Sequence, residues 1–459
     1  MKITIVGIGF IGLVNALGFT AKGHSVFALD SDKKKIAALR KGETNILENK
    51  LQDYLTKYGD SIRFTSEYRD AIFGADIVVV CNEVYEKENG VVDLVGFYST
   101  LKECSKHIQN DVTFVIRSTV PVGTCAEVKE FLSTLTGHKY RIDVVANPDF
   151  CSQGTAMKDM LMPSRIVVGL SSREAQNAVK ELYKNFDCPL LVASPESAEL
   201  IKYAANAYLA IKLSYINEIA DLCDTLGADI QEVSYGIGLD PRIGGKYLYS
   251  GIGFGGPSLP QDTRVLLNTA QNNNVSLSVL DAAMRVNERR PSTIIRKIKN
   301  VLGDNLSDKR FAVLGLSYKG NTDDIRQSPA FKVVDELLKE DSRIIAYDPI
   351  STSTFRKKMK SDQHIAYANT LDEALKTCDV AIFLNESEEF KQLTNENFVE
   401  YMKKPIVFDG KGVLNPYQLK DVMYFAVGKK LRRKRIWQKK EAYRKASFCF
   451  ALMIILRLS

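Results

Sequence analysis

Short apolar runs alternate with segments of helical periodicity along the first 200 residues of the chain. The first run, Lys2–Val6, leads into a glycine-rich turn and a helical stretch that ends near Lys22. A second run at 26–29 closes on Asp30. Further apolar runs lie at 77–81, 112–116, 144–146 and 166–168. Strands that alternate with helices in this way predict a parallel sheet with helices on both faces.

The segment 196–226 contains neither Gly nor Pro, and its apolar residues recur at steps of three and four. This spacing predicts one long helix, of about 46 Å at 1.5 Å per residue. Pro195 precedes it, and proline is common at the start of a helix. A helix of this length is expected to connect two domains and to offer a dimer interface.

After residue 309 the pattern of strand, turn and helix begins again. A strand at 310–316, a polar turn and a helix from about Pro329 lead to a strand at 343–347, which closes on Asp348. Two later strands are expected at 380–384 and 406–409. The chain is therefore predicted to be an α/β protein with two Rossmann-like, doubly wound parallel sheets joined by a long central helix. We expect ligands in the cleft between these halves.

The positive charge of the chain is concentrated near its C-terminus. The whole chain carries +7, whereas the stretch 429–445 holds ten lysines and arginines and one glutamate, which leaves −2 for the rest. A slightly acidic body lacks the clustered basic footprint that nucleic acids require, so nucleic acid is not expected as a partner. The tail is interpreted as a solvated terminus, with an anionic membrane surface or RNA as alternatives.

Cysteine and histidine positions exclude two classes of site. The eight cysteines and four histidines form neither a CxxC pair nor a zinc-ligand spacing, so no metal is expected and reduced thiols indicate a cytoplasmic protein. The uncharged stretch 3–21 has the length of a membrane anchor, but four glycines and three polar residues within it argue against one. The apolar run 446–456 is shorter than the roughly 20 residues that a span needs.

The glycine turn after the first strand has the form GxGxxG, at 7–12, and Asp30 follows 18 residues after Gly12. Glycines in such a turn let backbone N–H groups and a helix N-terminus approach a pyrophosphate, while an acid accepts hydrogen bonds from the ribose hydroxyls. An acid also repels a 2′-phosphate. The motif therefore favours NAD over NADP.

Lys202 and Asn206 lie four residues apart on the predicted long helix and so share one face. The ordinary interpretation is a solvent-facing lysine beside a packing asparagine. The small apolar residues around them, Ala204, Ala205 and Ala207, favour burial at a cleft instead. A buried ammonium there would stabilise an alkoxide or transfer a proton.

The segment 251–262 places four glycines within six positions and then Ser258 and Asp262, four residues apart. One interpretation is a flexible hinge before a helix. The other is a loop whose amides surround a sugar or phosphate and which presents Ser258 at a helix start. Two further segments, RSTVP at 117–121 and NPDF at 147–150, follow strands at the edge where parallel sheets bind ligands, although both also suit ordinary turns.

Taken together, these motifs resemble the UDP-glucose/GDP-mannose dehydrogenase family over roughly residues 1–425. Motifs that occur together in one order are far more specific than any single one. The segments that carry the resemblance are GIGFIG (7–12), STVPVGT (118–124), NPDFCSQGTA (147–156), ELIKYAANAYLA (199–210), DPRIG (240–244), GFGGPSLPQD (253–262), GLSYKGNTDDIRQSP (315–329) and FDGKGVL (408–414).

The resemblance implies an enzyme that oxidises the C6 alcohol of a nucleotide sugar through an aldehyde to a carboxylate with two NAD. UDP-glucose, or a related UDP-sugar, is the expected substrate and UDP-glucuronate the product. It also implies a homodimer and a chain divided into an NAD-binding Rossmann domain (1–195), a central helical dimerisation domain (196–300) and a C-terminal Rossmann-like nucleotide-sugar domain (301–425). A basic and apolar tail (426–459) is expected beyond the resemblance.

Roles carried over by motif fall into three groups. The expected catalytic residues are Lys202, Asn206, Ser258, Asp262, Thr119 and Asp149. The expected cofactor-binding residues are Gly7, Ile8, Gly9, Phe10, Ile11, Gly12, Asp30, Lys35, Thr119, Gln153 and Arg326. The expected substrate-binding residues are Asp149, Phe150, Lys202, Asn206, Arg242, Tyr249, Gly253, Phe254, Gly255 and Lys319, of which Arg242 resembles the arginine that reaches a neighbouring subunit's substrate.

Four positions depart from the family pattern. Ser258 replaces the nucleophilic cysteine, Asp149 shortens a glutamate, Gln153 replaces a second acid, and Gln261 replaces a lysine. A thiol has a pKa of about 8.5 and ionises readily, whereas an alkyl hydroxyl needs a strong adjacent base. The first oxidation needs no nucleophile and is expected to survive. For the second oxidation two outcomes remain open, slow completion or release of the aldehyde. A further alternative is a homologue that binds NAD and nucleotide sugar without turnover.

Overall fold

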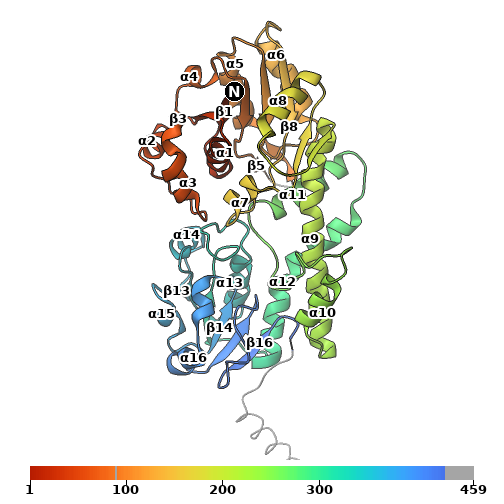
Figure 1. Cartoon of the computed structure of the whole chain (residues 1–459). Coiled ribbons are helices and arrows are strands. Elements are labelled where there is room, and N and C mark those ends of the chain that lie inside the picture. The colour runs from red at the N-terminus through yellow and green to blue at the C-terminus, as the bar shows by residue number, and fades with distance from the viewer. Residues whose placement is uncertain (88–89, 430–459) are drawn as a thin grey trace, which may run out of the picture. The chain divides into compact units, whose positions relative to one another are not determined.

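The computed structural model describes residues 1–87 and 90–429 (Figure 1). Within it the chain forms two compact units. The first unit holds residues 1–208 and 261–277, and the second holds residues 209–260 and the described residues from 278 onward. The predictions about the tail beyond residue 429 lie outside the described residues.

The first unit is built on an eight-stranded sheet with the order β10-β9-β8-β7-β4-β1-β2-β3. Its inner strands are almost wholly apolar because helices cover both faces. Every pair is parallel except β8 and β9, so the predicted parallel sheet is confirmed apart from this junction. The strands are β1 (Lys2–Val6), β2 (Ser25–Leu29), β3 (Ile62–Thr65), β4 (Ile77–Val80), β7 (Val112–Ile116), β8 (Ile142–Ala146), β9 (Ile166–Gly169) and β10 (Leu190–Ala193).

Two apolar layers hold helices against this sheet. Residues such as Ile5 and Val79 face one layer, and Val80 and Phe114 face the other, because successive side chains of a strand point to opposite faces. The first layer is covered by α1 (Phe10–Ala21), α2 (Lys33–Leu39), α3 (Leu51–Tyr58), α7 (Ala156–Leu161) and α8 (Arg173–Tyr183), and the second by α4 (Tyr68–Ile72), α5 (Val95–Ser105) and α6 (Thr124–Leu135).

The long helix predicted at 196–226 is confirmed as α9 (Pro195–Leu226), a continuous helix of 32 residues. Its residues up to Tyr208 belong to the first unit and the later ones to the second. The chain returns to the first unit with α11 (Leu259–Asn272), most of which lies in the segment 261–277. This return puts Asp262 in the same unit as Lys202.

The second unit contains a six-stranded parallel sheet with the order β13-β12-β11-β14-β15-β16. Apolar layers on its two faces include helices α10, α12, α13 and α14 on one side and α15 and α16 on the other. The elements are β11 (Arg310–Leu314), β12 (Arg343–Tyr347), β13 (Ile365–Tyr367), β14 (Val380–Phe383), β15 (Ile406–Asp409), β16 (Met423–Ala426), α10 (Ile230–Gly238), α12 (Ser278–Leu302), α13 (Pro329–Lys339), α14 (Thr352–Lys358), α15 (Leu371–Leu375) and α16 (Asn395–Tyr401).

The internal repeat predicted from the sequence is confirmed in its hydrogen bonds. Gly7 follows β1 and Gly315 follows β11, both with positive φ, and each donates its N–H to the last residue of the neighbouring strand at 2.9 Å. The acid after that strand, Asp30 or Asp348, accepts the N–H of the residue after the glycine, also at 2.9 Å. Both sheets therefore open with the same strand, turn, helix and acid.

The uncharged stretch 3–21 forms β1 and α1, two elements of the first unit. Among residues 1–87 and 90–429, no helix combines the length and the apolar character that crossing a bilayer requires.

Candidate active site

The glycine turn after β1 is closed too tightly for side chains. Gly7 has φ of +86°, and a Cβ at Gly12 would lie 1.9 Å from the Gly7 carbonyl oxygen. Glycine at both positions lets α1 begin directly against the end of β1. The N–H groups of the first turn of this helix then face the space in which a dinucleotide pyrophosphate binds.

Asp30 braces the glycine turn from the end of β2. Its carboxylate accepts hydrogen bonds from Ile8 N and Asp32 N, both at 2.9 Å, and from Lys35 Nζ at 2.8 Å. The structure thus brings together Asp30, Lys35 and the glycine turn, as the sequence predicted. This cradle of backbone amides with an acid beside it fits the pyrophosphate and adenosine ribose of NAD.

Lys202, Asn206 and Asp262, three of the predicted catalytic residues, all belong to the first unit. Lys202 is 8% exposed, and its Nζ donates to the Asp149 carbonyl oxygen at 2.6 Å. Asn206, one turn further along α9, donates to Asp262 Oδ2 at 2.5 Å. Burial raises the pKa of the Asp262 carboxyl, while the Lys202 charge and the Asn206 hydrogen bond act in the opposite direction. A buried cation and a buried acid are therefore available for proton transfer.

Thr119 belongs to a loop that is tied to α9 by a residue the sequence analysis missed. Glu199 Oε2 accepts from Gly123 N at 2.6 Å, and its Oε1 accepts from Cys125 N at 2.9 Å. Thr119, Glu199 and Lys202 line the same pocket. The signal was present in the sequence, because Glu199 lies three residues before Lys202 and so shares its helix face.

Asp149 supports Lys202 with its backbone rather than with its carboxylate. The carboxylate pairs with Arg117 at 2.7 Å, and both side chains are 8% exposed. Arg117 also donates to Asn147 Oδ1 at 3.1 Å, while its Nε has no partner among the described residues. The predicted catalytic acid at 149 is thus part of a buried ion pair that fixes the carbonyl to which Lys202 bonds.

The other predicted residues of this segment lie close to the same centre. The ring of Phe150 lies 5.5 Å from Lys202 Nζ and 4.0 Å from the guanidinium carbon of Arg165. Gln153 follows in the segment that leads to α7, where it is half-buried. The role of Gln153 in binding the cofactor stays a prediction.

A small hairpin holds α11 in the first unit. The hairpin consists of β5 (Tyr85–Glu86) and β6 (Val92–Asp93). Arg264 of α11 makes two hydrogen bonds of 2.7 Å to the Glu86 carboxylate. Gln261, which stands where the family has lysine, donates to the Val84 carbonyl oxygen at 3.1 Å. These contacts fix the helix that carries Asp262, and no sequence pattern indicated them.

The glycine-rich loop is packed within the second unit. A Cβ at Gly255 would lie 2.1 Å from the Gln327 carbonyl oxygen, and one at Gly256 would lie 2.6 Å from the Tyr318 ring. Three amides of the loop already have partners, since Gly251 N donates to Asn217 Oδ1, Phe254 N to Asn287 Oδ1 and Gly256 N to Arg326 O. This packing argues against a flexible hinge. The three bonded amides are already occupied, so the interpretation of a loop whose amides surround a sugar or phosphate stays a prediction.

Ser258 lies directly before α11 and is exposed. None of the seven cysteines in the described part of the chain is suited to replace the missing nucleophile. Burial raises the pKa of every one of these thiols, for example that of Cys81 to about 12. A thiol with a raised pKa is a poor nucleophile at neutral pH. Among the described residues, no cysteine is therefore expected to act as a nucleophile.

The predicted substrate residues of the second unit lie at several places. The side chain of Arg242 is 89% exposed and pairs with Asp240 at 2.6 Å. Arg326 pairs in the same way with Asp324 at 2.6 Å. Tyr249 is exposed, and Lys319 Nζ lies 5.5 Å from the Tyr318 ring. Their contacts with a nucleotide sugar or with NAD stay predictions.

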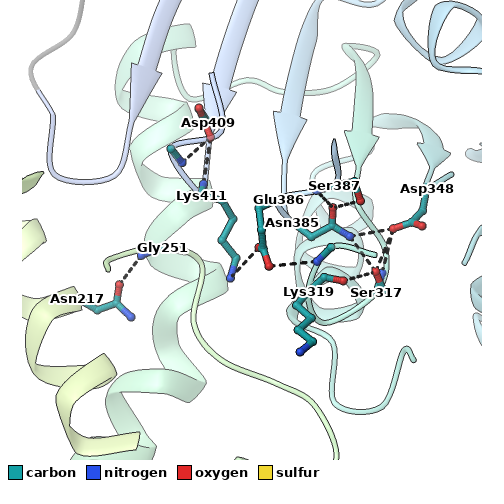
Figure 2. Close-up of polar contacts among 12 residues, drawn as sticks. Asn217, Gly251, Ser317, Lys319, Asp348, Asn385, Glu386, Ser387, Asp409 and Lys411 are labelled. Carbon is teal, nitrogen blue, oxygen red and sulfur yellow. Dashed lines mark hydrogen bonds and ion pairs between the residues drawn. The ribbon is translucent and has the colours of Figure 1, made fainter. Parts of the chain in front are cut away.

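The acid that closes β12 is sealed from solvent, unlike Asp30. Figure 2 shows Ser317 and Asn385 converging on the Asp348 carboxylate, with Asn385 Nδ2 at 2.9 Å, and Asp348 is 2% exposed. The side chain of Lys319 points away from this network, although its carbonyl accepts from Ser317 Oγ at 2.7 Å. The second sheet thus repeats the Rossmann turn, but the carboxylate of Asp348 is not accessible to a ribose.

Asp409 organises the loop after β15, for which the sequence analysis named a motif but no role. Its buried carboxylate accepts from the N–H groups of Lys411, Gly412 and Leu414 at 3.1, 2.7 and 2.9 Å. Figure 2 shows the Lys411 side chain reaching toward Glu386, with Nζ 3.9 Å from the carboxylate. The loop therefore presents a lysine at the carboxyl edge of the sheet.

Asp262→Asn is expected to stabilise the fold at neutral pH. The folded protein is less stable at higher pH when an acid has a higher pKa in the folded state than in the unfolded state, where it is near 3.9. The free energy of unfolding then falls as pH rises from the unfolded pKa through the folded one. Asparagine does not ionise and so avoids this loss. In urea unfolding, the free energy of unfolding of the variant should therefore rise relative to that of the wild type between pH 4 and pH 7. Asp53→Asn, at an exposed position, serves as the control. The expectation would be contradicted if the free energy of unfolding of the wild type rose relative to that of Asp262→Asn over this pH range.

Three profiles of the UDP-glucose/GDP-mannose dehydrogenase family match the chain in order. The NAD binding domain matches residues 1–187, the central domain residues 196–289 and the UDP binding domain residues 312–416. The matches cover most of both sheets and most of the helices between them.

Matches to named relatives extend over nearly the whole chain. UDP-glucose 6-dehydrogenase of Rickettsia felis is 36% identical over 438 residues, which is 94% of this chain and 97% of the relative. UDP-glucose 6-dehydrogenase YwqF of Bacillus subtilis is also 36% identical, with 94% and 98% covered. The structure of a UDP-glucose dehydrogenase from Pyrobaculum islandicum matches with a TM-score of 0.86 at 28% identity, over 94% of this chain and 98% of that one.

The matched family domains and the relatives named above are consistent with the glycine turn and the Lys202 group that the structure shows. NAD is accordingly the cofactor, and the substrate is a nucleotide sugar. The chain therefore belongs to the UDP-glucose/GDP-mannose dehydrogenase family and is an NAD-dependent oxidoreductase.

Proposed function

We propose that this enzyme oxidises the C6 alcohol of UDP-glucose to the aldehyde and then to the carboxylate of UDP-glucuronate. The observation that carries the proposal is the group of Lys202, Asn206 and Asp262 in the first unit, in which the lysine and the acid are buried and the asparagine is half-buried. Both relatives named above are UDP-glucose 6-dehydrogenases, which supports UDP-glucose over other nucleotide sugars. NAD, when bound, accepts the hydride that leaves C6 in each oxidation.

The first oxidation requires that the C6 hydroxyl lose its proton as the hydride leaves. The Lys202 ammonium is the group we assign to the developing alkoxide, because it is buried and held in place by the Asp149 carbonyl oxygen. Asp262, whose pKa burial raises, is assigned to the uptake and release of the proton. Thr119 lines the Lys202 pocket and is assigned to the water network.

The second oxidation requires an oxygen nucleophile at the aldehyde carbon. Ser258 would have to lose its proton to a base, whereas the thiol of a cysteine ionises readily at its pKa of about 8.5. We therefore propose that water adds to the aldehyde and that the resulting hydrate loses the second hydride and its protons to give the carboxylate. This step is expected to be slower than the first.

We assign the nucleotide half of the substrate to the second unit. Its 312–416 segment matches the family's UDP binding domain. Tyr249, Lys319 and the loop 253–255 are the proposed contacts with the substrate, and Arg326 the proposed contact with NAD. These assignments rest on the motifs and on the position of each residue in the second unit.

A count of NADH formed per UDP-glucose is expected to show one fast equivalent and a second, slower one. Excess NAD and limiting UDP-glucose separate the two steps in a single absorbance trace. In Ser258→Cys both equivalents should form at similar rates, because a thiol restores the nucleophile. Ser258→Ala is the matched control and should keep the wild-type trace, since water rather than the serine adds to the aldehyde.

Other outcomes separate the alternatives. A trace that stops at one equivalent supports the second candidate, an enzyme that releases the aldehyde, which the replacement of cysteine by Ser258 favours. Loss of the second equivalent in Ser258→Ala would contradict the water route. No NADH from UDP-glucose or from any other UDP-sugar would contradict the proposed function itself.

We propose that the enzyme is a homodimer that associates through α9 and α10 of the second unit. Large apolar side chains are exposed on these helices and directly after α10, and exposed apolar patches are typical of interfaces. They are Tyr215, Leu222, Leu226, Tyr235 and Leu239. Arg242 follows α10 and extends into solvent, as a residue that reaches a partner's substrate would. The cytoplasmic location also stays a prediction.

A further inference from the structure

Glu83 places a carboxylate beside the glycine turn that follows β1. A Cβ built on Gly9 would meet Glu83 Oε1 at 3.4 Å, and the three atoms nearest to it all belong to Glu83. The other carboxylate oxygen, Oε2, accepts a hydrogen bond from the Tyr85 hydroxyl at 2.5 Å. Tyr85 begins the hairpin strand β5. The carboxylate is thus held at Gly9 by a residue of the hairpin.

The open side of Gly9 is the side from which a pyrophosphate approaches. In a turn of this kind the second glycine lacks a side chain so that the backbone reaches the pyrophosphate. The pyrophosphate then lies against the N-terminus of the following helix, and α1 begins at Phe10 directly after Gly9. The Glu83 carboxylate therefore lies in the space that the pyrophosphate needs and carries charge of the same sign.

We propose that Glu83 is an internal competitor of NAD, whose carboxylate, held over Gly9 by Tyr85, opposes the binding of the cofactor's pyrophosphate. When NAD binds, the Glu83 side chain either rotates away from Gly9 or stays in place and lowers the affinity through repulsion between like charges. Glu83 is exposed, so it turns into solvent at little cost in packing. Glu83 thereby determines the affinity for NAD, although the cofactor motif does not contain it.

Glu83→Gln is expected to tighten the dissociation constant for NAD by about five-fold at low salt. Two unit charges about 4 Å apart in water repel by an amount that corresponds to this factor. Glutamine keeps the size of the side chain and removes only its charge. Titration calorimetry with NAD alone measures the constant without turnover. The gain should shrink between about 20 mM and about 300 mM sodium chloride, because salt screens exposed charges.

Tyr85→Phe tests the tether. Loss of the hydroxyl releases the carboxylate, so this variant should also bind NAD more tightly, though by less than Glu83→Gln. In the double variant Glu83→Gln/Tyr85→Phe the tyrosine change should add nothing, because no charge remains to be held. Glu174→Gln removes an exposed carboxylate of α8 in the same unit and should leave the constant unchanged.

Three results would overturn the proposal. An unchanged constant in Glu83→Gln would show that the charge does not matter. A weaker constant would show that Glu83 is a ligand of the cofactor. Tighter binding in Glu83→Ala but not in Glu83→Gln would show that space rather than charge is limiting. Circular dichroism of each variant verifies that the fold is kept.

Discussion

Lys202→Met is expected to lower kcat for the first oxidation by about 10³-fold, within the range of general acid–base catalysis. Methionine fills the same space but carries neither charge nor proton. The ammonium of Lys202 is buried, it bonds to the Asp149 carbonyl oxygen, and its charge lowers the pKa of Asp262 against the effect of burial. Without it, the alkoxide loses its partner and Asp262 retains its proton more firmly. The first phase of NADH formation at saturating substrate measures the loss.

The controls for this variant separate chemistry from folding and binding. Lys180→Met changes an exposed lysine of α8 in the same unit and should leave kcat unchanged. The dissociation constant for NAD should also stay the same in Lys202→Met, because the glycine turn and Asp30 are untouched. A loss of less than ten-fold in kcat would show that Lys202 is not the group that stabilises the alkoxide.

Arg117→Met is expected to reduce the free energy of unfolding by about 3–5 kcal/mol, the usual cost of removing one member of a buried ion pair. The guanidinium is bonded to Asp149 Oδ1 and Asn147 Oδ1, and removing it leaves the buried Asp149 carboxylate without a cation, with the N–H of Cys151 still bonded to Oδ2. The carbonyl of Asp149 that holds Lys202 should shift as well, so kcat should fall together with stability. Urea unfolding at neutral pH measures the first effect.

A double variant makes this prediction specific to charge. Arg117→Met/Asp149→Leu leaves neither charge in the interior and should regain part of the stability lost in Arg117→Met. Arg173→Met, at an exposed position of α8, should change stability by less than about 0.5 kcal/mol. A loss below about 1 kcal/mol in Arg117→Met would contradict the role of the pair.

Much of the fold was predictable because its signals are local. Apolar runs that end at Asp30 and Asp348 became β2 and β12 within one residue, since short apolar runs bounded by polar residues are typical of buried strands. The antiparallel junction between β8 and β9 and the hairpin of β5 and β6 were not predicted. Strand direction and isolated two-residue strands leave no periodic pattern in the sequence.

The candidate site was predictable only where residues share one element. Lys202 and Asn206 were paired from their spacing on one helix, and Glu199 belonged to the same face. The pairing of Asp149 with Arg117, 32 residues away, was not indicated by the sequence, and the catalytic role of Asp149 stays a prediction. Nothing in a linear pattern distinguishes a carboxylate that faces a substrate from one that faces a buried cation.

The sequence by itself determined the two Rossmann-like sheets, the long helix, the NAD motif and the family, because hydrophobic periodicity and ordered motifs act over short stretches of chain. Tertiary structure alone decided that α11 returns Asp262 to the unit of Lys202, that Glu86 and Arg264 fix this helix, and that Glu83 lies over Gly9. These contacts join residues up to 178 positions apart. Such contacts depend on how helices and strands pack against one another in three dimensions. The spacing of residues within a short segment of sequence does not reveal this packing.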